Sequence, residues 1–190
     1  MTGDVDIANT PNNNDSITHT PNWRSMLVGT MGLGGKGYFV LDVTNPGFSA
    51  KPARTGQTAD TPVPSGKPAS NFSATNAAQL VVMDRTRSPE SGELACADND
   101  DACLTIRNEE RDIGHITAEP VRHNNDILRA TQITRMNNNR WAVVLGNGYN
   151  SFNQRPVLLV QYLDGNKELL RIPATTDTPG TGKANDNGLG

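Results

Sequence analysis

The feature of this chain that most constrains its fold is a sequence unit that occurs twice. One copy, residues 140–151 (RWAVVLGNGYNS), has an apolar run after Trp141 that ends in a Gly-Asn-Gly turn and an aromatic residue. The earlier copy, residues 23–38 (WRSMLVGTMGLGGKGY), has the same order of tryptophan, short β-type run, glycines and aromatic residue. Two such units, well separated along the chain, indicate a repeated β-sheet module.

Composition limits the class of protein. Of the 190 residues, 35% are hydrophobic and 5% aromatic, and there are 18 glycines and 12 prolines. So small a share of core-forming residues, with so many glycines and prolines, favours a loop-rich β protein with exposed insertions. The net charge of −3 gives no reason to expect nucleic acid or a membrane surface as partner. No apolar run approaches the roughly 20 residues needed for a transmembrane segment.

Apolar runs and turn signals predict short strands joined in hairpins. Residues 32–37 are a glycine-rich turn, Asn137–Asn139 is a second turn and Asp164-Gly165 is a third. No segment has the periodicity of an amphipathic helix, so the predicted fold class is all-β. The predicted strands cover residues 23–29, 38–43, 79–84, 112–121, 130–136, 141–145, 157–163 and 168–172.

The predicted organisation has three parts. Residues 1–22 are a polar leader or linker, residues 23–172 form the sheet domain, and residues 173–190 are a linker of low hydrophobicity. Polar, proline-rich or acidic insertions interrupt the domain at residues 46–76 and 86–111. Short strands in repeated hairpins with long insertions favour a β-propeller over a sandwich, and the predicted strands suffice for two to three blades of an incomplete ring.

Three blocks, in this order, resemble the PilC/PilY family. Residues 35–46 are similar to that family's "GGxGYxxLDVTxP" strand, residues 112–114 with Pro120 to its "DLGxxxxxP" strand, and residues 141–151 to its "WxxVxGNGYNS" segment. The closing residues 187–189 resemble an "NGL" that precedes the next blade. The residues that carry the first and last of the three blocks are Gly35, Gly37, Tyr38, Asp42, Trp141, Gly146, Asn147, Gly148 and Tyr149.

The resemblance implies a quinoprotein-like β-propeller in a type IV pilus tip-associated adhesin or biogenesis factor. It implies a non-enzymatic role in pilus biogenesis, cell adhesion and twitching motility. The implied partners are pilus subunits or minor pilins and a host or abiotic surface ligand. The implied location is extracellular or at the outer membrane, on the pilus. The family's calcium loop follows the NGL segment, so we expect a central fragment without a cofactor of its own, and calcium only in the full-length protein.

Two cysteines flank an acidic run. Cys96 and Cys103 pair in an oxidising compartment or stay free thiols in a reducing one, and two thiols alone are too few for a zinc site. Asp98 and Asp100 are the first candidates for a calcium site. The acids are bunched, without the glycine and the bidentate glutamate of a typical calcium loop, which favours a solvated acidic loop.

Other candidate sites have a simpler interpretation. The glycines of residues 32–37 precede a strand rather than a helix, which favours a tight turn over a phosphate site. His115 and His123, with Glu119 between them, would need to share one strand face to bind a metal or transfer protons, and Pro120 opposes that alignment.

The tryptophans and two aspartates have structural interpretations. Trp23 and Trp141 are expected to fill core between blades. Asp84 and Asp164 end strands and are expected to cap turns.

Two other functions stay open. One is a quinone-dependent propeller dehydrogenase, although its tryptophan-docking repeat "AxDxxTGxxxW" is absent from this chain. The other is a structural repeat segment with no site of its own.

Overall fold

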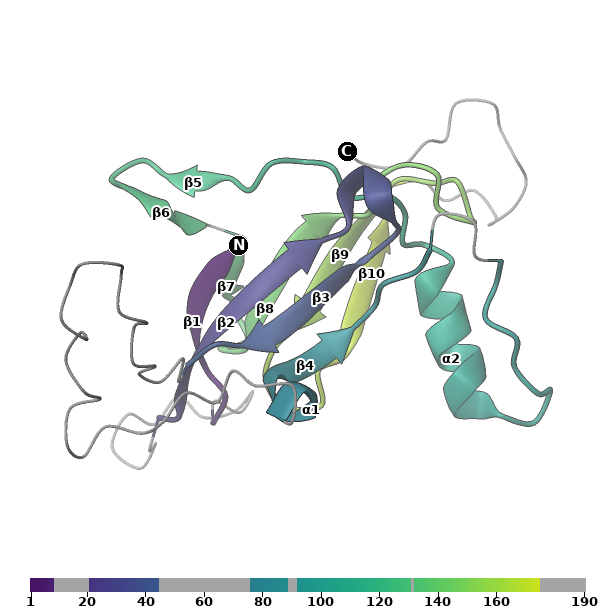
Figure 1. Cartoon of the computed structure of the whole chain (residues 1–190), viewed down its shortest axis with the longest axis horizontal. Coiled ribbons are helices and arrows are strands. Elements are labelled where there is room, and N and C mark those ends of the chain that lie inside the picture. Colours follow the sequence, from purple (N-terminus) through teal and green to yellow (C-terminus); the bar gives the residue numbers. More distant parts are fainter. Residues whose placement is uncertain (9–20, 45–75, 89–91, 131, 175–190) are drawn as a thin grey trace, which may run out of the picture.

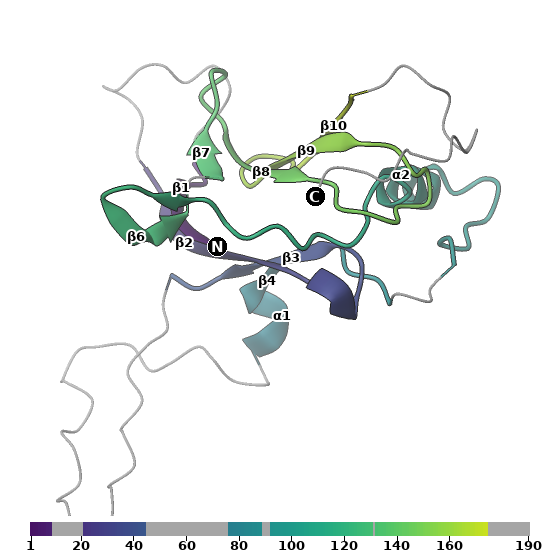
Figure 2. The same cartoon turned by 90° about the horizontal axis from the view of Figure 1, so that it is seen from above.

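The computed structural model describes residues 1–8, 21–44, 76–88, 92–130 and 132–174 (Figure 1). Over these ranges the chain is mostly β, with two four-stranded antiparallel sheets in two layers (Figure 2). Most of the insertion predicted at residues 46–76, and nearly all of the linker predicted at residues 173–190, lie outside the described residues.

Each sheet is a simple meander. The first has the order β1-β2-β3-β4, and the second has the order β10-β9-β8-β7. The strands of the first are β1 (Thr2–Asp6), β2 (Trp23–Thr30), β3 (Tyr38–Asp42) and β4 (Val81–Asp84). The strands of the second are β7 (Ile133–Arg135), β8 (Trp141–Gly146), β9 (Val157–Tyr162) and β10 (Leu169–Pro173).

The remaining elements are short. A 3-10 turn, Gly32–Gly34, connects β2 to β3, and a helix of one turn, α1 (Ala77–Leu80), leads into β4. Between the two sheets in sequence come α2 (Asp101–Glu110) and a hairpin of β5 (Arg122–His123) and β6 (Asp126–Ala130). Helix α2 lies beside β10, outside the two layers (Figures 1 and 2).

The sheets face each other strand by strand. Gly3 of β1 lies against Ile133 of β7, so closely that a Cβ on the glycine would be 2.9 Å from the Ile133 Cγ2. At β2 and β8, Trp23 and Trp141 meet edge to face with ring centroids 5.7 Å apart. At β3 and β9, the buried Tyr38 hydroxyl donates a 2.8 Å hydrogen bond to the Gln161 Oε1. Equivalent strands of the two meanders therefore lie opposite one another.

The hydrophobic core lies between the layers. Because side chains alternate along a strand, one face of each sheet supplies the core cluster between the layers. Each fully buried Val, Leu, Ile or Met side chain stabilises the fold by about 1.5–3 kcal/mol. Besides Tyr38, the strand residues of this cluster are Val5, Met26, Val28, Val40, Ile133, Val143, Leu145, Val157, Leu159 and Leu169.

The hairpin predictions are confirmed. Strands β2 and β3, β7 and β8, and β9 and β10 pair antiparallel across the three predicted turns. The Trp pair differs from the prediction, because Trp23 is 54% exposed and the contact lies at the rim of the core rather than within it.

Three sequence predictions are wrong. The segment 1–22, predicted as a leader, contains β1, whose backbone pairs with β2 although Val5 is its one strongly apolar residue. The insertion 86–111, predicted without a helix, contains α2. This helix buries no residue, so the sequence has no stripe of core-facing apolar residues to indicate it. The predicted strand at 112–121 is instead an irregular segment with one isolated bridge, between His115 and Tyr149.

The glycines of the first motif are required by a close backbone approach. Gly37 has φ +95°, and a Cβ there would lie 1.9 Å from the Arg85 carbonyl oxygen. At Gly35 the corresponding distance, to the Arg87 carbonyl oxygen, is 2.8 Å. Lys36 and Arg87 exchange both backbone hydrogen bonds beside these contacts. Only a residue without a side chain lets the turn pack on the segment that follows β4.

We predict that Gly37→Ala lowers the free energy of unfolding by about 2–4 kcal/mol, because the methyl group meets backbone and the left-handed φ is strained. Gly34→Ala is the matched control, since a Cβ there has no atom within 4 Å, and we expect a change within about 0.5 kcal/mol. Urea unfolding followed by tryptophan fluorescence measures both. Equal stabilities of the two variants would contradict the packing argument.

Candidate functional site

The three motif blocks meet at the end of the sheets where the 3-10 turn lies, at the top of Figure 1. The Gly37 N–H donates to the Gly114 carbonyl oxygen at 3.0 Å, and the Gly114 N–H donates to the Asn147 carbonyl oxygen at 2.8 Å. The middle block therefore links the first block to the last. We call residues 35–38, 112–115 and 146–151 the motif junction.

Asn147 organises the turn after β8. Its side chain is fully buried, and its Nδ2 donates to the carbonyl oxygens of Asp112, at 2.8 Å, and Arg155, at 2.9 Å. Its Oδ1 accepts a hydrogen bond from the Val157 N–H at 3.0 Å. These bonds satisfy backbone groups that have no strand partner, which is the common use of a buried amide side chain. Asn147 therefore has a structural role at the motif junction.

Asp112 is the fully buried carboxylate of the motif junction. Arg155 donates to both of its oxygens at 2.9 Å, and the Asn153 Nδ2 donates at 2.7 Å. A second cation, Arg171 of β10, donates to Oδ2 at 2.9 Å. Burial acts to raise the pKa of Asp112, but the hydrogen bonds from Arg155 and Asn153 and the charges of both arginines outweigh it, so the pKa lies below its ordinary value.

His115 and Tyr149 form the bridge between the last two blocks. They exchange backbone hydrogen bonds of 2.8 and 3.2 Å, and their rings stack with centroids 5.0 Å apart. The His115 Nδ1 lies 3.1 Å from the Gly32 carbonyl oxygen, which ties this bridge to the 3-10 turn. Gly148 has φ +73°, and a Cβ there would be 2.1 Å from the His115 carbonyl oxygen. His115 thus packs within the fold, apart from Glu119, which is exposed.

Another ion-pair cluster, which the sequence did not indicate, closes the opposite end of the second sheet. The Arg140 Nε donates to the buried Asp164 Oδ1 at 2.8 Å, and its guanidinium also pairs with Glu168. Asp164 accepts the Trp141 N–H at 2.8 Å, so it joins two strands rather than capping a turn alone. The Glu168 and Asp164 hydrogen bonds raise the Arg140 pKa, and the Arg140 hydrogen bond lowers the pKa of Glu168. Asp84 does cap a turn, accepting hydrogen bonds from Thr86.

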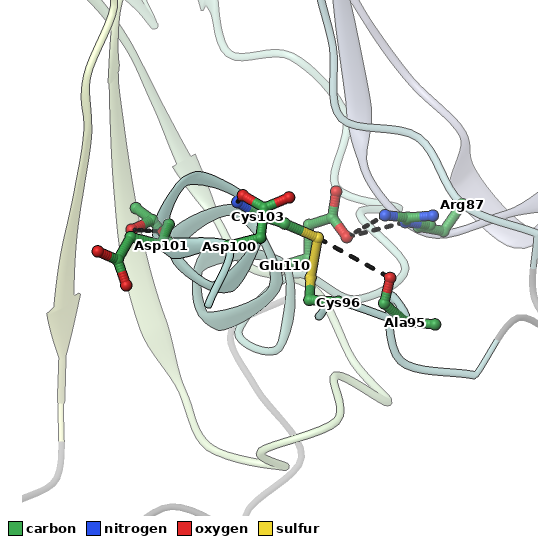
Figure 3. Close-up of a disulfide and its surroundings, with 8 residues drawn as sticks. Arg87, Ala95, Cys96, Asp100, Asp101, Cys103 and Glu110 are labelled. Carbon is green, nitrogen blue, oxygen red and sulfur yellow. Dashed lines mark hydrogen bonds and ion pairs between the residues drawn. A yellow bond between two sulfur atoms is a disulfide. The ribbon is translucent and has the colours of Figure 1, made fainter. Parts of the chain in front are cut away.

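Helix α2 begins in the acidic run between the cysteines. Cys96 and Cys103 are joined by a disulfide, with Cα atoms 5.6 Å apart (Figure 3). Asp100 is the N-cap, and its carboxylate accepts the Cys103 N–H at 2.9 Å. A carboxylate at this position stabilises the helix start. Asp98 is exposed beside it.

No group of three or more His, Cys, Asp or Glu side chains that could hold a metal ion occurs in the part of the chain that the structure describes. A calcium site at Asp98 and Asp100 stays a prediction. His123, the other histidine of the predicted cluster, lies in β5.

Ion pairs hold the C-terminal half of α2 against the rest of the fold. Glu110 pairs with Arg87 (Figure 3), and Glu109 pairs with Arg85 at 2.8 Å. Arg171 of β10 donates to the Asn108 carbonyl oxygen. Charged contacts with β10 and with residues 85–87, which follow β4 and are called the β4 extension here, therefore hold the helix in place. The helix itself buries no residue.

No helix among the described residues has the length and the apolar character needed to cross a membrane.

The fold and the motif junction define a scaffold: two meander sheets joined by glycine, asparagine and ion-pair contacts that serve structure. Among curated proteins, the chain is 29% identical over 172 residues to "Type IV pilus biogenesis factor PilY1 homolog" of Xylella fastidiosa (strain Temecula1). This match covers 88% of the chain and 8% of that protein. A second protein with the same description, from the same organism, is 75% identical over 24 residues, which are 13% of the chain and 2% of that protein.

The resemblance predicted from the motif blocks is confirmed by this similarity to a type IV pilus biogenesis factor. Each match spans less than a tenth of the length of the relative. No family profile matches the chain, and no solved structure matches it.

We predict that Asp112→Asn lowers the free energy of unfolding by about 3 kcal/mol at pH 7, because it leaves Arg155 and Arg171 facing a neutral group. The folded-state pKa of Asp112 lies below its unfolded value near 4, so its contribution is present above about pH 4 and is lost as the pH falls through the lower folded value. The difference between wild type and variant should therefore shrink in acid. Urea unfolding between pH 3 and pH 7 measures it.

The exposed Asp98→Asn serves as the control, and we expect it to follow the wild type at every pH. A difference between wild type and Asp112→Asn that stayed constant down to pH 3 would show that the Asp112 charge does not stabilise the fold.

Proposed function

We propose that this chain is a segment of a β-propeller in a type IV pilus biogenesis factor, located at the cell surface in association with the pilus. The observation that carries the proposal is the similarity over 88% of the chain to a relative described as a type IV pilus biogenesis factor. Most of the residues that carry the resemblance belong to the motif junction, the exceptions being Asp42 and Trp141. They specify how the segment folds, which is why a scaffold is the function they support best.

The stacking of the sheets supports the propeller. Propeller blades are four-stranded meanders, and neighbouring blades pack face to face. Both sheets have this order, and β1, β2 and β3 face β7, β8 and β9. On the outer face of the second sheet, Leu158 and Ile172 pair across β9 and β10, and both are partly exposed, as is Leu170. A further blade of the same propeller would cover this apolar strip.

The role proposed for the segment is non-enzymatic. Rigid sheets hold insertions, and insertions on a rigid scaffold commonly carry binding. Within the insertion 86–111, the disulfide and the ion pairs of α2 give the displayed surface a fixed shape. The partners we propose are pilus subunits or minor pilins, with a host or abiotic surface as the ligand in adhesion.

We predict that full-length protein carrying Gly37→Ala fails to support pilus assembly, because the segment cannot pack its first turn, whereas Gly34→Ala supports it fully. Chromosomal variants in the source organism are compared by twitching-zone diameter and by pilin recovered from sheared pili. An antibody to residues 92–111 follows the protein in pilus, outer-membrane and cytosolic fractions.

Protein confined to the cytosol, or normal piliation with Gly37→Ala despite a destabilised fold, would overturn the pilus role. Dye reduction by the whole protein with a quinone and an alcohol would instead favour the dehydrogenase alternative.

A further inference from the structure

We propose that a small pocket beside α2 binds a carboxylate side chain of a protein partner. The pocket lies between α2, the extension of β4 and the segment 92–94, and its volume is about 50 Å³. A water molecule needs roughly 10–15 Å³ by the same measure, so the pocket has room for one carboxylate group. This inference concerns the chemistry of the site and does not depend on the pilus role.

The pocket, which we call the α2 pocket, is rich in cations. Its lining includes Lys36, Arg85, Arg87, Arg107 and Arg111. Three of these are neutralised: Arg85 pairs with Glu109, Arg87 with Glu110, and Arg111 with Glu93. Within the described ranges, Lys36 and Arg107 have no such carboxylate partner. The pocket thus carries an excess of positive charge.

Arg107 supplies the specific donor. Its Nε is buried and, among the described residues, has no hydrogen-bond partner. A buried donor without a partner costs about 1–3 kcal/mol, more for a charged group. A carboxylate that pairs with the Arg107 guanidinium forms a charge-assisted interaction, and its charge is also balanced by Lys36. Occupation of the pocket would therefore give Arg107 the carboxylate partner that it lacks among the described residues.

The apolar part of the lining favours a carboxylate with a short apolar stem. Leu94, Ile113 and Phe152 belong to this part, and the Arg111 guanidinium lies over the Phe152 ring at 4.4 Å. An acidic side chain places methylene groups next to its charged end, which matches an apolar wall beside a cationic one. A phosphate dianion has no such stem and would leave the apolar wall uncovered. The pocket therefore fits the end of an aspartate or glutamate side chain.

The disulfide gives the pocket a fixed wall. Cys96 is tied to Cys103 in the first turn of α2 (Figure 3), and the segment 92–94, which lines the pocket, comes directly before this link in sequence. The Arg87–Glu110 pair, drawn in the same view, holds the other side. A site formed before its ligand arrives loses less entropy on binding.

The test is an NMR titration of the ¹⁵N-labelled 190-residue chain with sodium propionate, with ionic strength held constant. The signal followed is the Arg107 Nε–Hε cross-peak, assigned by its loss in Arg107→Lys. We expect a saturable shift with a dissociation constant on the order of millimolar, as suits a single small group. Sodium phosphate at the same ionic strength should give no saturable shift.

Two variants locate the site. Arg107→Gln and Lys36→Gln should each weaken propionate binding by roughly tenfold or more, as expected when a charged partner of a hydrogen-bonded anion is removed. In the Arg107 variant the shift is read from the backbone amides of residues 92–94. Arg135→Gln, an exposed cation on β7, is the matched control and should bind as the wild type does.

Arg107 also lies in the last turn of α2, where a cation offsets the helix dipole. Urea unfolding of each variant therefore accompanies the titration, and Lys36→Gln tests the site independently of that effect. No saturable shift up to about 100 mM propionate, unchanged binding in both variants, or equally tight phosphate binding would overturn the proposal.

Discussion

The buried carboxylate of Asp112 is the contact on which the rest of the fold depends. It comes directly after α2, and its partners are Arg155 from the turn before β9, Asn153 from the same turn and Arg171 from β10. A carboxylate without these partners would be too costly to bury. Two residues later, Gly114 joins the turn of the first sheet to that of the second. This charged group therefore holds the irregular segment that follows the helix against the second sheet, and Gly114 links the same segment to the first sheet.

The sequence predicted what local patterns can encode. Alternating apolar residues and turn signals identified the hairpins, and the glycines and Asn147 stand where backbones approach closely. It did not identify α2, because the stabilising features of that helix are Asp100 at its start, a disulfide and distant arginines rather than an apolar stripe. The same holds for Arg140 with Asp164 and for the α2 pocket, since ion pairs between distant residues leave no periodic signal.

The two sheets and the helix between them are stabilised in different ways. The sheets share an apolar core in which equivalent strands meet, and Tyr38 and Gln161 form a buried polar contact inside it. Helix α2 buries no residue; charged contacts attach it to the sheets, and the disulfide ties it to the segment just before it. Changes on the exposed face of the helix consequently leave the core packing intact. The exposed residues of the helix can therefore change without any change in the core residues of the sheets.

The disulfide has a consequence for the integrity of the chain when a protease cuts it. The acidic peptide between Cys96 and Cys103 is exposed, with Asp98 at its surface, and exposed loops are where proteases cut. A cut between the two cysteines opens the backbone but leaves its two ends joined through sulfur. The protein on either side of such a nick stays one covalent molecule, and the strands that follow α2 are not lost with the broken peptide bond.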